Sequence, residues 1–373
     1  MRQAGIIFTR ERLFSGYDGK ICKGTPKLAY DGEQTMYLGY NTMSCFGSDV
    51  FLHEYVAKST DGGKTFGEPE INDIAKDTWQ DGIRINYSAT LRYSKGHKKW
   101  YGIGRTTTYS DDKRPIGVVG GEGHVGPPWM PIYWFVDQES QKFVTWKEIP
   151  FPFEYAVATP YHILEFENGD LLIAYYFRAS RRSLISEIMT VRYAMEEDGL
   201  RMVSYGEPLK VSGYARGIHE PCVTYFDGKY YMTIRNDEMG LFAESDDGLH
   251  FSDPKPWVWE DGTLLENYNT QQHWVRNEKG LFLVYTRRTE YNDHVFRNRA
   301  PLFMTRFDEE RKCLIRDQEV VLVPELGAQL GNFTVLEISE KESWVSTTEI
   351  MTGVGCEKYG GDNSIWIAKV YSK

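Results

Sequence analysis

One pattern recurs six times along this chain of 373 residues: a short apolar run, a tight turn that usually contains Gly, and a second apolar run. Two apolar runs around such a turn are typical of a β-hairpin. The copies are TPKLAYDGEQTMYLGY (25–40), YSATLRYSKGHKKWYGIGR (87–105), TPYHILEFENGDLLIAYYFR (159–178), EPCVTYFDGKYYMTIRN (220–236), QQHWVRNEKGLFLVYTRR (271–288) and NFTVLEISEKESWVSTTE (332–349). A repeat constrains the whole fold, because each copy must bury its apolar face against its neighbours.

Each hairpin is followed by further strand-like sequence, such as EYVAKSTDGGKTF after the first copy and SIWIAKVY after the last. Two hairpins make a four-stranded antiparallel sheet, and six such sheets are the blades of a β-propeller. Pro26 and Pro221 occupy the same place in their hairpins, three copies apart. The sequence therefore predicts an all-β, six-bladed β-propeller that spans residues 1–373 as a single domain.

The last copy is short of one strand, because only three strand-like segments follow residue 332. The N-terminal segment GIIFTR (5–10) is a strand without a hairpin of its own. We expect this segment to be the outer strand of the sixth blade. This closure would remove the open seam that a propeller otherwise leaves.

Charge and hydropathy exclude several classes of protein. The net charge is −10 and there is no Lys/Arg-rich run, which argues against a nucleic-acid partner. No stretch approaches 18 apolar residues, so no membrane-spanning helix is expected. The start, MRQAGIIFTRERLF, lacks the apolar core of a signal peptide. We expect a cytoplasmic protein, or a periplasmic or secreted one if a leader has been removed.

The cysteine and histidine spacings predict neither a metal site nor a cofactor. The five cysteines are scattered and odd in number, without a CxxC pair, and the histidines do not stand at ligand spacings. We expect free thiols in a reducing compartment.

Two short stretches share a Ser-x-Asp-Gly pattern followed by an aromatic residue, KSTDGGKTF (58–66) and ESDDGLHF (244–251). The Asp can accept hydrogen bonds from nearby backbone N–H groups, and Gly allows a positive φ. We interpret both as structural turns between the third and fourth strands of their blades, rather than as reactive sites. These stretches resemble the Asp-box, or BNR repeat, of sialidases, which are six-bladed propellers of glycoside hydrolase type.

In a propeller, the loops that enter the inner strands and those that leave the second strands line one mouth of the central channel. Four of the six exits carry Arg, a pattern that indicates an anionic substrate group. These are Arg105, Arg178, Arg235 and Arg287. The other substrate-binding candidates at these edges and in the neighbouring loops are Arg84, Gln271, Gln272, His273, Arg288, Arg299, Asn332 and Glu349.

The resemblance to sialidases also implies catalytic roles: an Asp as acid/base, a Tyr–Glu pair as nucleophile, and three Arg on the substrate carboxylate. Asp49 stands in the loop that leads to the first Asp-box, as the acid does in that family. The family has its first Arg just ahead of a Pro on the first inner strand. Here Gly24-Thr25 precedes that Pro, with Lys23 nearby.

His219-Glu220-Pro221 is the most distinctive local group of residues at an inner-strand entry. Glu220 and Asp49 on two sides of a channel would suit glycoside hydrolysis, with His219 adjusting or hydrogen-bonding the Glu. Alternatively, Glu220 could activate a Tyr nucleophile, for which Tyr291 and Tyr359 are the candidates.

Two long insertions are expected at the mouth. The polar segment 286–303 would bind substrate, and the Gly/Pro-rich segment 117–131 would form a rim or lid with Trp129 at its tip.

Three functions fit these features. The first is an exo-acting, sialidase-like glycoside hydrolase that cleaves a terminal anionic sugar from a glycan. The second is a polysaccharide lyase in which Arg neutralises a uronate carboxylate while His219, His273 or a Tyr moves protons. The third is a non-catalytic carbohydrate-binding propeller. Fold alone does not separate them.

Overall fold

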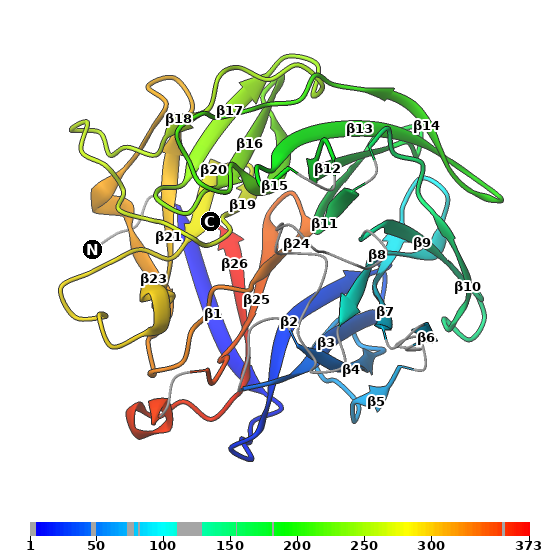
Figure 1. Cartoon of the computed structure of the whole chain (residues 1–373). Helices are drawn as coiled ribbons and strands as arrows, with labels where there is room; N and C mark the ends of the chain where they lie inside the picture. The colour runs from blue at the N-terminus through cyan, green and yellow to red at the C-terminus, as the bar shows by residue number, and fades with distance from the viewer. Residues whose placement is uncertain are drawn as a thin grey trace.

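The computed structural model describes residues 5–45, 50–72, 78–80, 83–109, 129–153, 155–180, 183–352 and 355–373. They form six antiparallel sheets arranged around a central axis (Figure 1), which confirms the predicted six-bladed β-propeller. The strands of blade one are β2 (Ile21–Tyr30), β3 (Met36–Ser44), β4 (Phe51–Ser59) and β5 (Glu70–Ile71). Those of blade two are β6 (Thr78–Gln80), β7 (Ile83–Ser94), β8 (Lys99–Tyr109), β9 (Pro131–Val136) and β10 (Phe143–Glu148).

The next two blades repeat the four-stranded order from the axis outward. Blade three consists of β11 (Tyr155–Glu165), β12 (Leu171–Arg178), β13 (Glu187–Glu196) and β14 (Gly199–Tyr205). Blade four consists of β15 (His219–Phe226), β16 (Lys229–Arg235), β17 (Leu241–Ser245) and β18 (Lys255–Pro256). The β15–β16 turn is Asp227-Gly228, with φ of 46° and 80°, as the Asp-Gly hairpin signal predicts.

The last two blades follow the same plan. Blade five consists of β19 (His273–Asn277), β20 (Gly280–Tyr285), β21 (Leu302–Asp308), β22 (Cys313–Leu314) and β23 (Val320–Val323). Blade six consists of β24 (Thr334–Ser339), β25 (Glu342–Thr348), β26 (Ile365–Ser372) and β1 (Ile6–Leu13). Three short 3₁₀ helices lie in the loops: η1 (Phe296–Asn298), η2 (Arg316–Gln318) and η3 (Cys356–Tyr359). Among the described residues, no helix is long and apolar enough to cross a bilayer.

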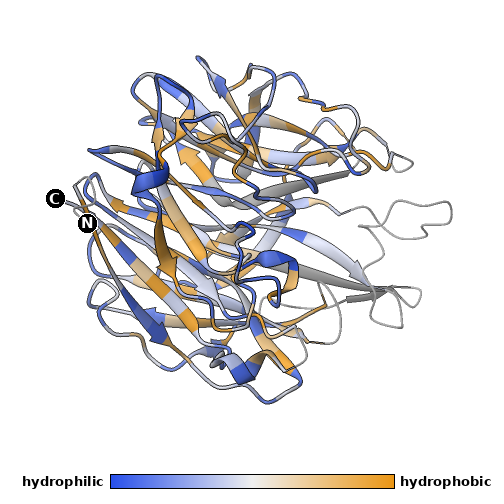
Figure 2. Ribbon diagram, turned by 90° about the vertical axis from the view of Figure 1, so that its left-hand side faces the viewer, coloured by the Kyte–Doolittle hydropathy of each residue, from blue (hydrophilic) through white to orange (hydrophobic). Residues whose placement is uncertain are grey.

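The N-terminal strand closes the ring, as predicted. β1 pairs antiparallel with β26 along its whole length, from Ile6 opposite Ser372 to Leu13 opposite Ile365. The start of β1 and the end of β26 therefore lie side by side at one end of the propeller (Figure 2). Because strands alternate in direction, the inner strands begin, and the second strands end, at the opposite end. That opposite end is the mouth discussed below.

The two Ser-x-Asp-Gly stretches are turns between the third and fourth strands of blades one and four, as predicted. In the first, the Ser59 hydroxyl donates to Asp61 Oδ1 (2.7 Å), and that oxygen accepts the backbone N–H groups of Lys64 and Thr65 (both 3.0 Å). In the second, Asp247 Oδ1 accepts the Ser245 hydroxyl (3.0 Å) and two backbone N–H groups. Lys369 Nζ donates to the carbonyl of Gly63 (3.5 Å), which places the first turn near the C-terminal strand and away from the mouth.

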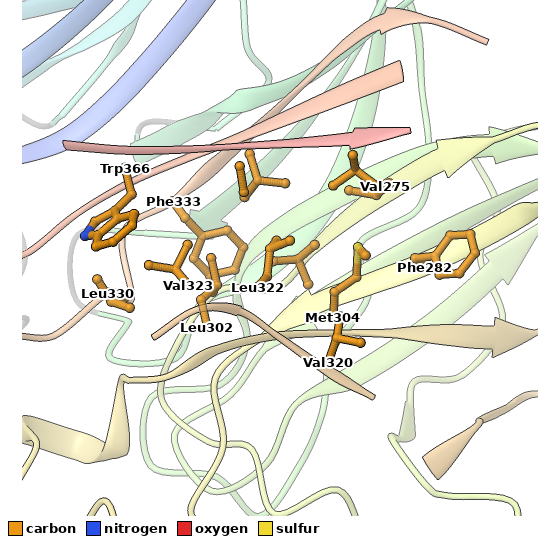
Figure 3. Close-up of a cluster of buried hydrophobic side chains, with 14 of the residues drawn as sticks. Val275, Phe282, Leu302, Met304, Val320, Leu322, Val323, Leu330, Phe333 and Trp366 are labelled. Carbon is orange, nitrogen blue, oxygen red and sulfur yellow. The ribbon is translucent and has the colours of Figure 1, made fainter. Parts of the chain in front are cut away.

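Apolar side chains from neighbouring blades pack together and hold the ring. Figure 3 shows one such cluster between blades five and six, to which Phe282 and Met304 of blade five and Trp366 of blade six all belong. Ile6 of the closing strand belongs to the same cluster. Full burial of a side chain of this size stabilises a protein by about 1.5–3 kcal/mol. The strands of this core hold the inner-strand entries in place.

Candidate functional site at the channel mouth

The candidate site begins with an irregularity at the start of β15. His219 faces Arg235, and Cys222 faces Thr233, so that Glu220 and Pro221 together oppose a single residue of β16. This is a β-bulge, and bulges redirect side chains next to functional sites. Glu220 has a φ of 44°, a left-handed conformation that is uncommon for a residue other than Gly.

Blade one carries the same bulge without the charges. Gly24 faces Asn41 and Lys27 faces Gly39, so that Thr25 and Pro26 are the extra pair. Thr25 has a φ of 48°, and its hydroxyl donates to Asn41 Oδ1 (2.8 Å). Blades one and four therefore share this bulge, and of these two only blade four places a charged pair on it.

Arg235 is held from both sides. Its Nη1 lies 2.8 Å from Glu220 Oε2, and its Nη2 donates to Asn269 Oδ1 (2.7 Å). Asn269 also has left-handed backbone, with a φ of 47°. The side chains of Arg235 and Glu220 are 15% and 24% exposed. Both partners of this guanidinium thus stand on backbone that costs on the order of 1 kcal/mol each to maintain, and such strain gathers at functional sites.

Glu220 is ionised in this setting. Burial by itself would raise the pKa of Glu220, but the charge and hydrogen bond of Arg235 outweigh burial and lower the pKa below its ordinary value. The charge of Arg299 adds a smaller effect of the same sign. A carboxylate of lowered pKa can accept a proton or stabilise a developing cation, but it is a poor general acid at neutral pH.

His219 is neutral. Burial, and then the charges of Arg235 and Arg216, lower the pKa of His219 to about 3. Its ring meets the ring of Tyr176 edge-on, with 5.5 Å between centroids. The Nδ1 atom of His219 is buried and has no hydrogen-bond partner among the described residues. A neutral imidazole beside a phenol is a pair that can relay a proton.

A second guanidinium contacts Tyr176 at its hydroxyl. Arg105 Nη1 donates to the Tyr176 hydroxyl (3.4 Å), and the guanidinium stands 4.4 Å above the ring of Trp129. Trp129 is 1% exposed, and its Nε1 donates to Thr108 Oγ1 (3.3 Å). The expectation that Trp129 is the tip of a lid is wrong, because this indole is packed beside β8. Residues 117–128 of the expected rim lie outside the described part.

A third guanidinium reaches the same asparagine as Arg235. Arg299 comes from the loop between β20 and β21, and its Nη2 donates to the backbone carbonyl of Asn269. Its Nη1 donates to Gln329 Oε1 (3.2 Å). Asn269 therefore joins Arg235 and Arg299 through its side chain and its backbone.

The other arginines at the strand exits have different surroundings. Arg287 forms an ion pair with Glu319 (2.7 Å), just ahead of the outer strand β23. Arg288 is exposed and pairs with Asp293 in its own loop (2.9 Å). Arg178 is buried at the end of β12. The backbone of Arg84 lies in β7, but its side chain is outside the described part.

The entry to blade five is filled by buried polar side chains that bond to backbone. Gln271 Nε2 donates to the carbonyl of Phe333 (2.9 Å), and Gln272 Nε2 donates to that of Thr270 (2.5 Å). His273 meets the ring of Phe333 edge-on, and burial lowers the pKa of this histidine to about 3. Asn332, ahead of β24, is partly exposed.

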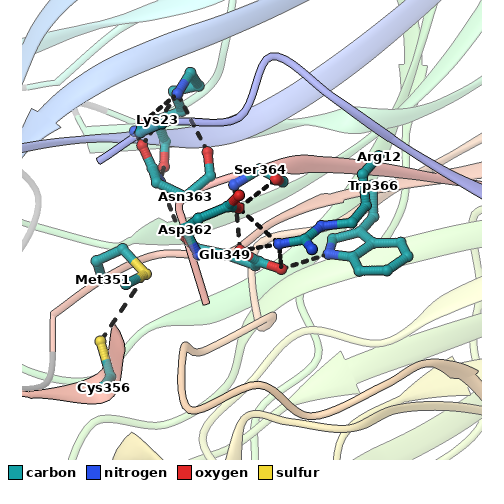
Figure 4. A network of polar contacts seen from close by, with 10 residues as sticks. Arg12, Lys23, Glu349, Met351, Cys356, Asp362, Asn363, Ser364 and Trp366 are labelled. Atoms are coloured by element: carbon teal, nitrogen blue, oxygen red, sulfur yellow. Dashed lines mark hydrogen bonds and ion pairs between the residues drawn. The ribbon is translucent and has the colours of Figure 1, made fainter. Parts of the chain in front are cut away.

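Glu349 lies in a network that holds blade six together (Figure 4). Its side chain is 1% exposed and accepts hydrogen bonds from Arg12 Nη2 (3.2 Å), Trp366 Nε1 (2.7 Å) and the backbone N–H groups of Asp362 (2.8 Å) and Ser364 (3.2 Å). Arg12 belongs to the closing strand β1. Glu349 therefore connects β1 to blade six.

Lys23 stands close to the position where sialidases carry their first Arg. Its ammonium donates to the carbonyls of Gly16 (3.0 Å) and Asn363 (3.2 Å) and to Asn363 Oδ1 (3.5 Å) (Figure 4). These three acceptors match the three protons of the ammonium group. Asp49, the expected acid, lies outside the described residues.

The structure thus brings together Glu220, His219, Arg235, Arg105 and Arg299 of the predicted set. Sequence reasoning did not select Tyr176 or Asn269. Tyr176 was findable, because it stands two residues before Arg178 on the same second strand and so shares its face. Asn269 gave no signal, since its role depends on a loop conformation. No group of three or more His, Cys, Asp or Glu within the described residues is arranged to hold a metal ion.

Comparison with known proteins supports the fold. No family model and no curated protein matches the chain. Among solved structures, a protein of unknown function from Dyadobacter fermentans DSM 18053 has a TM-score of 0.65 at 15% identity, over 99% of this chain and 100% of that one. The Trypanosoma rangeli sialidase in complex with the inhibitor DANA has a TM-score of 0.58 at 14% identity, over 96% of this chain and 59% of that one. The Hadza microbial sialidase Hz136 has a TM-score of 0.58 at 11% identity, over 93% of this chain and 65% of that one.

The chain is therefore a six-bladed β-propeller of sialidase-like fold. It spans about three fifths of the length of the sialidases it resembles. At these identities the likeness concerns the fold.

Proposed function

We propose that the protein is an exo-acting glycoside hydrolase that removes a terminal anionic sugar at this mouth. The observation that carries the proposal is the rigid placement of Arg235 between Glu220 and Asn269, with Arg299 on the same Asn269. A guanidinium has five N–H donors, so Arg235 keeps donors for a ligand after these two contacts. Preorganised guanidinium groups bind carboxylates tightly and with defined geometry.

The catalytic roles follow from the charge states. Glu220 is an ionised carboxylate, which suits a base or a stabiliser of the oxocarbenium-like transition state. Tyr176 contacts the ring of His219, the neighbour of Glu220, and it replaces Tyr291 and Tyr359 as the candidate nucleophile. Asp49 supplies the acid. Sialidases among the structural neighbours, one of them in complex with sialic acid, support a sugar-cleaving role for this mouth.

A panel of fluorogenic aryl-glycosides, including sialic acid and uronic acid glycosides, tests this proposal. We expect turnover of at least one acidic glycoside, with at least about a hundredfold loss of kcat in Glu220→Gln and in Asp49→Asn. Glu197→Gln, on the exposed β13–β14 turn, is the matched control. Full activity in both Glu220→Gln and Asp49→Asn would refute the assignment.

A polysaccharide lyase is the second candidate, and the neutral His219 against Tyr176 favours it. In that reaction the arginines would neutralise a uronate carboxylate, while His219 and Tyr176 would move protons. New ultraviolet absorbance from an unsaturated uronate, with no fluorescence from acidic aryl-glycosides, would identify a lyase. Saturable binding of an acidic oligosaccharide without any turnover would identify a binding module.

A further inference from the structure

Three of the five cysteines meet at the junction of blades one and six, far apart in the sequence. Cys22 lies in β2, Cys45 follows β3, and Cys356 lies in η3. All three belong to one buried cluster, which also contains Met43 and Met351. Cys356 Sγ lies 3.9 Å from Met351 Sδ (Figure 4). The hydrolase proposed above makes no use of this sulfur-rich cluster.

Cys22 and Cys45 are placed on the same face of one strand pair. Cys22 faces Met43 across the β2–β3 ladder, and the backbone N–H of Cys45 donates to the carbonyl of Lys20 (3.1 Å). Cys45 therefore stands diagonally opposite Cys22, with both side chains directed into the cluster. Cys45 lies in a bend just past the end of β3, where its backbone can adjust more easily than inside the ladder.

The two thiols differ in pKa and in exposure. A hydrogen bond from the Cys22 thiol, helped by Tyr17, lowers the pKa of Cys45 to about 7, although burial opposes this effect. The same contact and burial raise the pKa of Cys22. Cys45 is also the more accessible of the two, at 9% exposure against 0%. The thiolate is the reactive form of cysteine, so Cys45 should react first.

We propose that Cys22 and Cys45 are a peroxide-sensitive thiol pair in which Cys45 is oxidised first and Cys22 then closes a disulfide. The Cys45 thiolate attacks hydrogen peroxide, forms a sulfenic acid and releases hydroxide. The Cys22 sulfur then attacks the sulfenic sulfur, and water leaves. Two electrons pass from the two sulfurs to one peroxide molecule. The cross-link would join β2 to the residue that follows β3.

The test uses the full chain, reduced and then treated with hydrogen peroxide. Remaining thiols are alkylated in denaturant, and tryptic peptides are mapped by mass spectrometry without reduction. Trypsin cuts after Lys20, Lys23, Lys27 and Lys58, so the expected product joins peptide 21–23 to peptide 28–58. A protein that keeps both thiols reduced, or that links either one to Cys356 instead, would overturn the proposal.

Variants separate the two roles. Cys22→Ser should accumulate a sulfenic acid on Cys45, detected by dimedone labelling. Cys45→Ser should slow peroxide-dependent thiol loss at least about tenfold, because little thiolate remains. Cys313→Ser, in β22 of blade five, is the control and should form the same cross-linked peptide as the unmodified chain. Dimedone labelling of Cys22 in Cys45→Ser would reverse the assignment. Peptide mapping of the unmodified chain decides the pair itself, even if a variant fails to fold.

Discussion

Glu220 forms a 2.8 Å ion pair with Arg235 at the bulge of blade four. At the equivalent bulge, blade one has the neutral pair of Thr25 and Asn41. The left-handed φ is almost the same in both blades, 44° at Glu220 and 48° at Thr25. Blades one and four therefore share the same backbone bulge, and blade four carries a charged pair on it. The backbone bulge and the Glu220–Arg235 pair can therefore be tested independently.

Removal of Arg235 should destabilise the fold as well as abolish activity. Arg235→Leu leaves Glu220 as an unpaired and largely buried carboxylate, which typically costs about 3 kcal/mol. Combining it with Glu220→Gln should recover about 1 kcal/mol or more of that loss. Unfolding in urea measures these changes. Arg201→Leu, which breaks the exposed pair with Glu196, should cost less than about 1 kcal/mol. Additive effects of the two changes at Glu220 and Arg235 would contradict the coupling.

Variants of Glu349 can show whether this residue has a structural role or binds substrate. Glu349→Leu leaves the Trp366 indole and two backbone N–H groups without their acceptor, whereas Arg12 keeps its contact with Asp362 (2.6 Å), so we expect a loss of about 3–5 kcal/mol in unfolding free energy. Glu349→Gln keeps part of the network and should lose less. The KM of an acidic substrate should stay within about twofold in Glu349→Gln. A large rise in KM with unchanged stability would instead place Glu349 in the substrate site.

The contribution of the closing strand β1 to stability can be tested by a deletion. Removal of residues 1–10 takes away most of β1 and exposes the edge of β26. We expect the melting temperature to fall by about 10 °C or more. Ile6→Ser should reproduce part of the fall, because Ile6 is 7% exposed, whereas Ile7→Ser should not, because Ile7 is 45% exposed. An unchanged melting temperature after the deletion would refute a structural role for this closure.

The fold could be predicted from the sequence because a propeller repeats its signals. Apolar runs around a turn such as Asp227-Gly228 are local features, and their recurrence gave the blade number and the place of the N-terminal strand. The charged partners could be predicted less well. Glu220 and Arg235 are both visible at strand edges, but their contact depends on a bulge. Asn269 reaches the site through a loop conformation, which no local pattern encodes, whereas Tyr176 lies on the same face of β12 as Arg178 and could have been selected.

The two Ser-x-Asp-Gly turns should matter for stability and not for turnover. Asp61→Ala removes the acceptor of two backbone N–H groups and of the Ser59 hydroxyl, so the melting temperature should fall by a few degrees. Asp247→Ala should act in the same direction. The kcat of either variant should match that of the unmodified chain at a temperature where both are folded. A large loss of kcat in a folded Asp61→Ala would mean that the turn has a catalytic role after all.

Buried histidines should make the protein sensitive to acid. Burial lowers the pKa of both His219 and His273 to about 3, below the ordinary value of 6.5. Between these two values the unfolded chain binds more protons than the folded one, so stability is complete above pH 6.5 and is lost as the pH falls toward 3. Each histidine contributes a slope of about 1.4 kcal/mol per pH unit in this window.

Urea unfolding at several pH values measures that slope. His273→Gln should remove the contribution of one histidine and flatten the dependence of unfolding free energy on pH. His250 is the control of opposite sign, because the hydrogen bond and charge of Asp247 raise its pKa. His250 therefore stabilises the fold below its unfolded pKa and loses that effect as the pH rises. His250→Gln should not flatten the dependence of unfolding free energy on pH between pH 3 and 6.5. If His273→Gln also left this slope unchanged, the burial of a neutral imidazole at the entry to blade five would be contradicted.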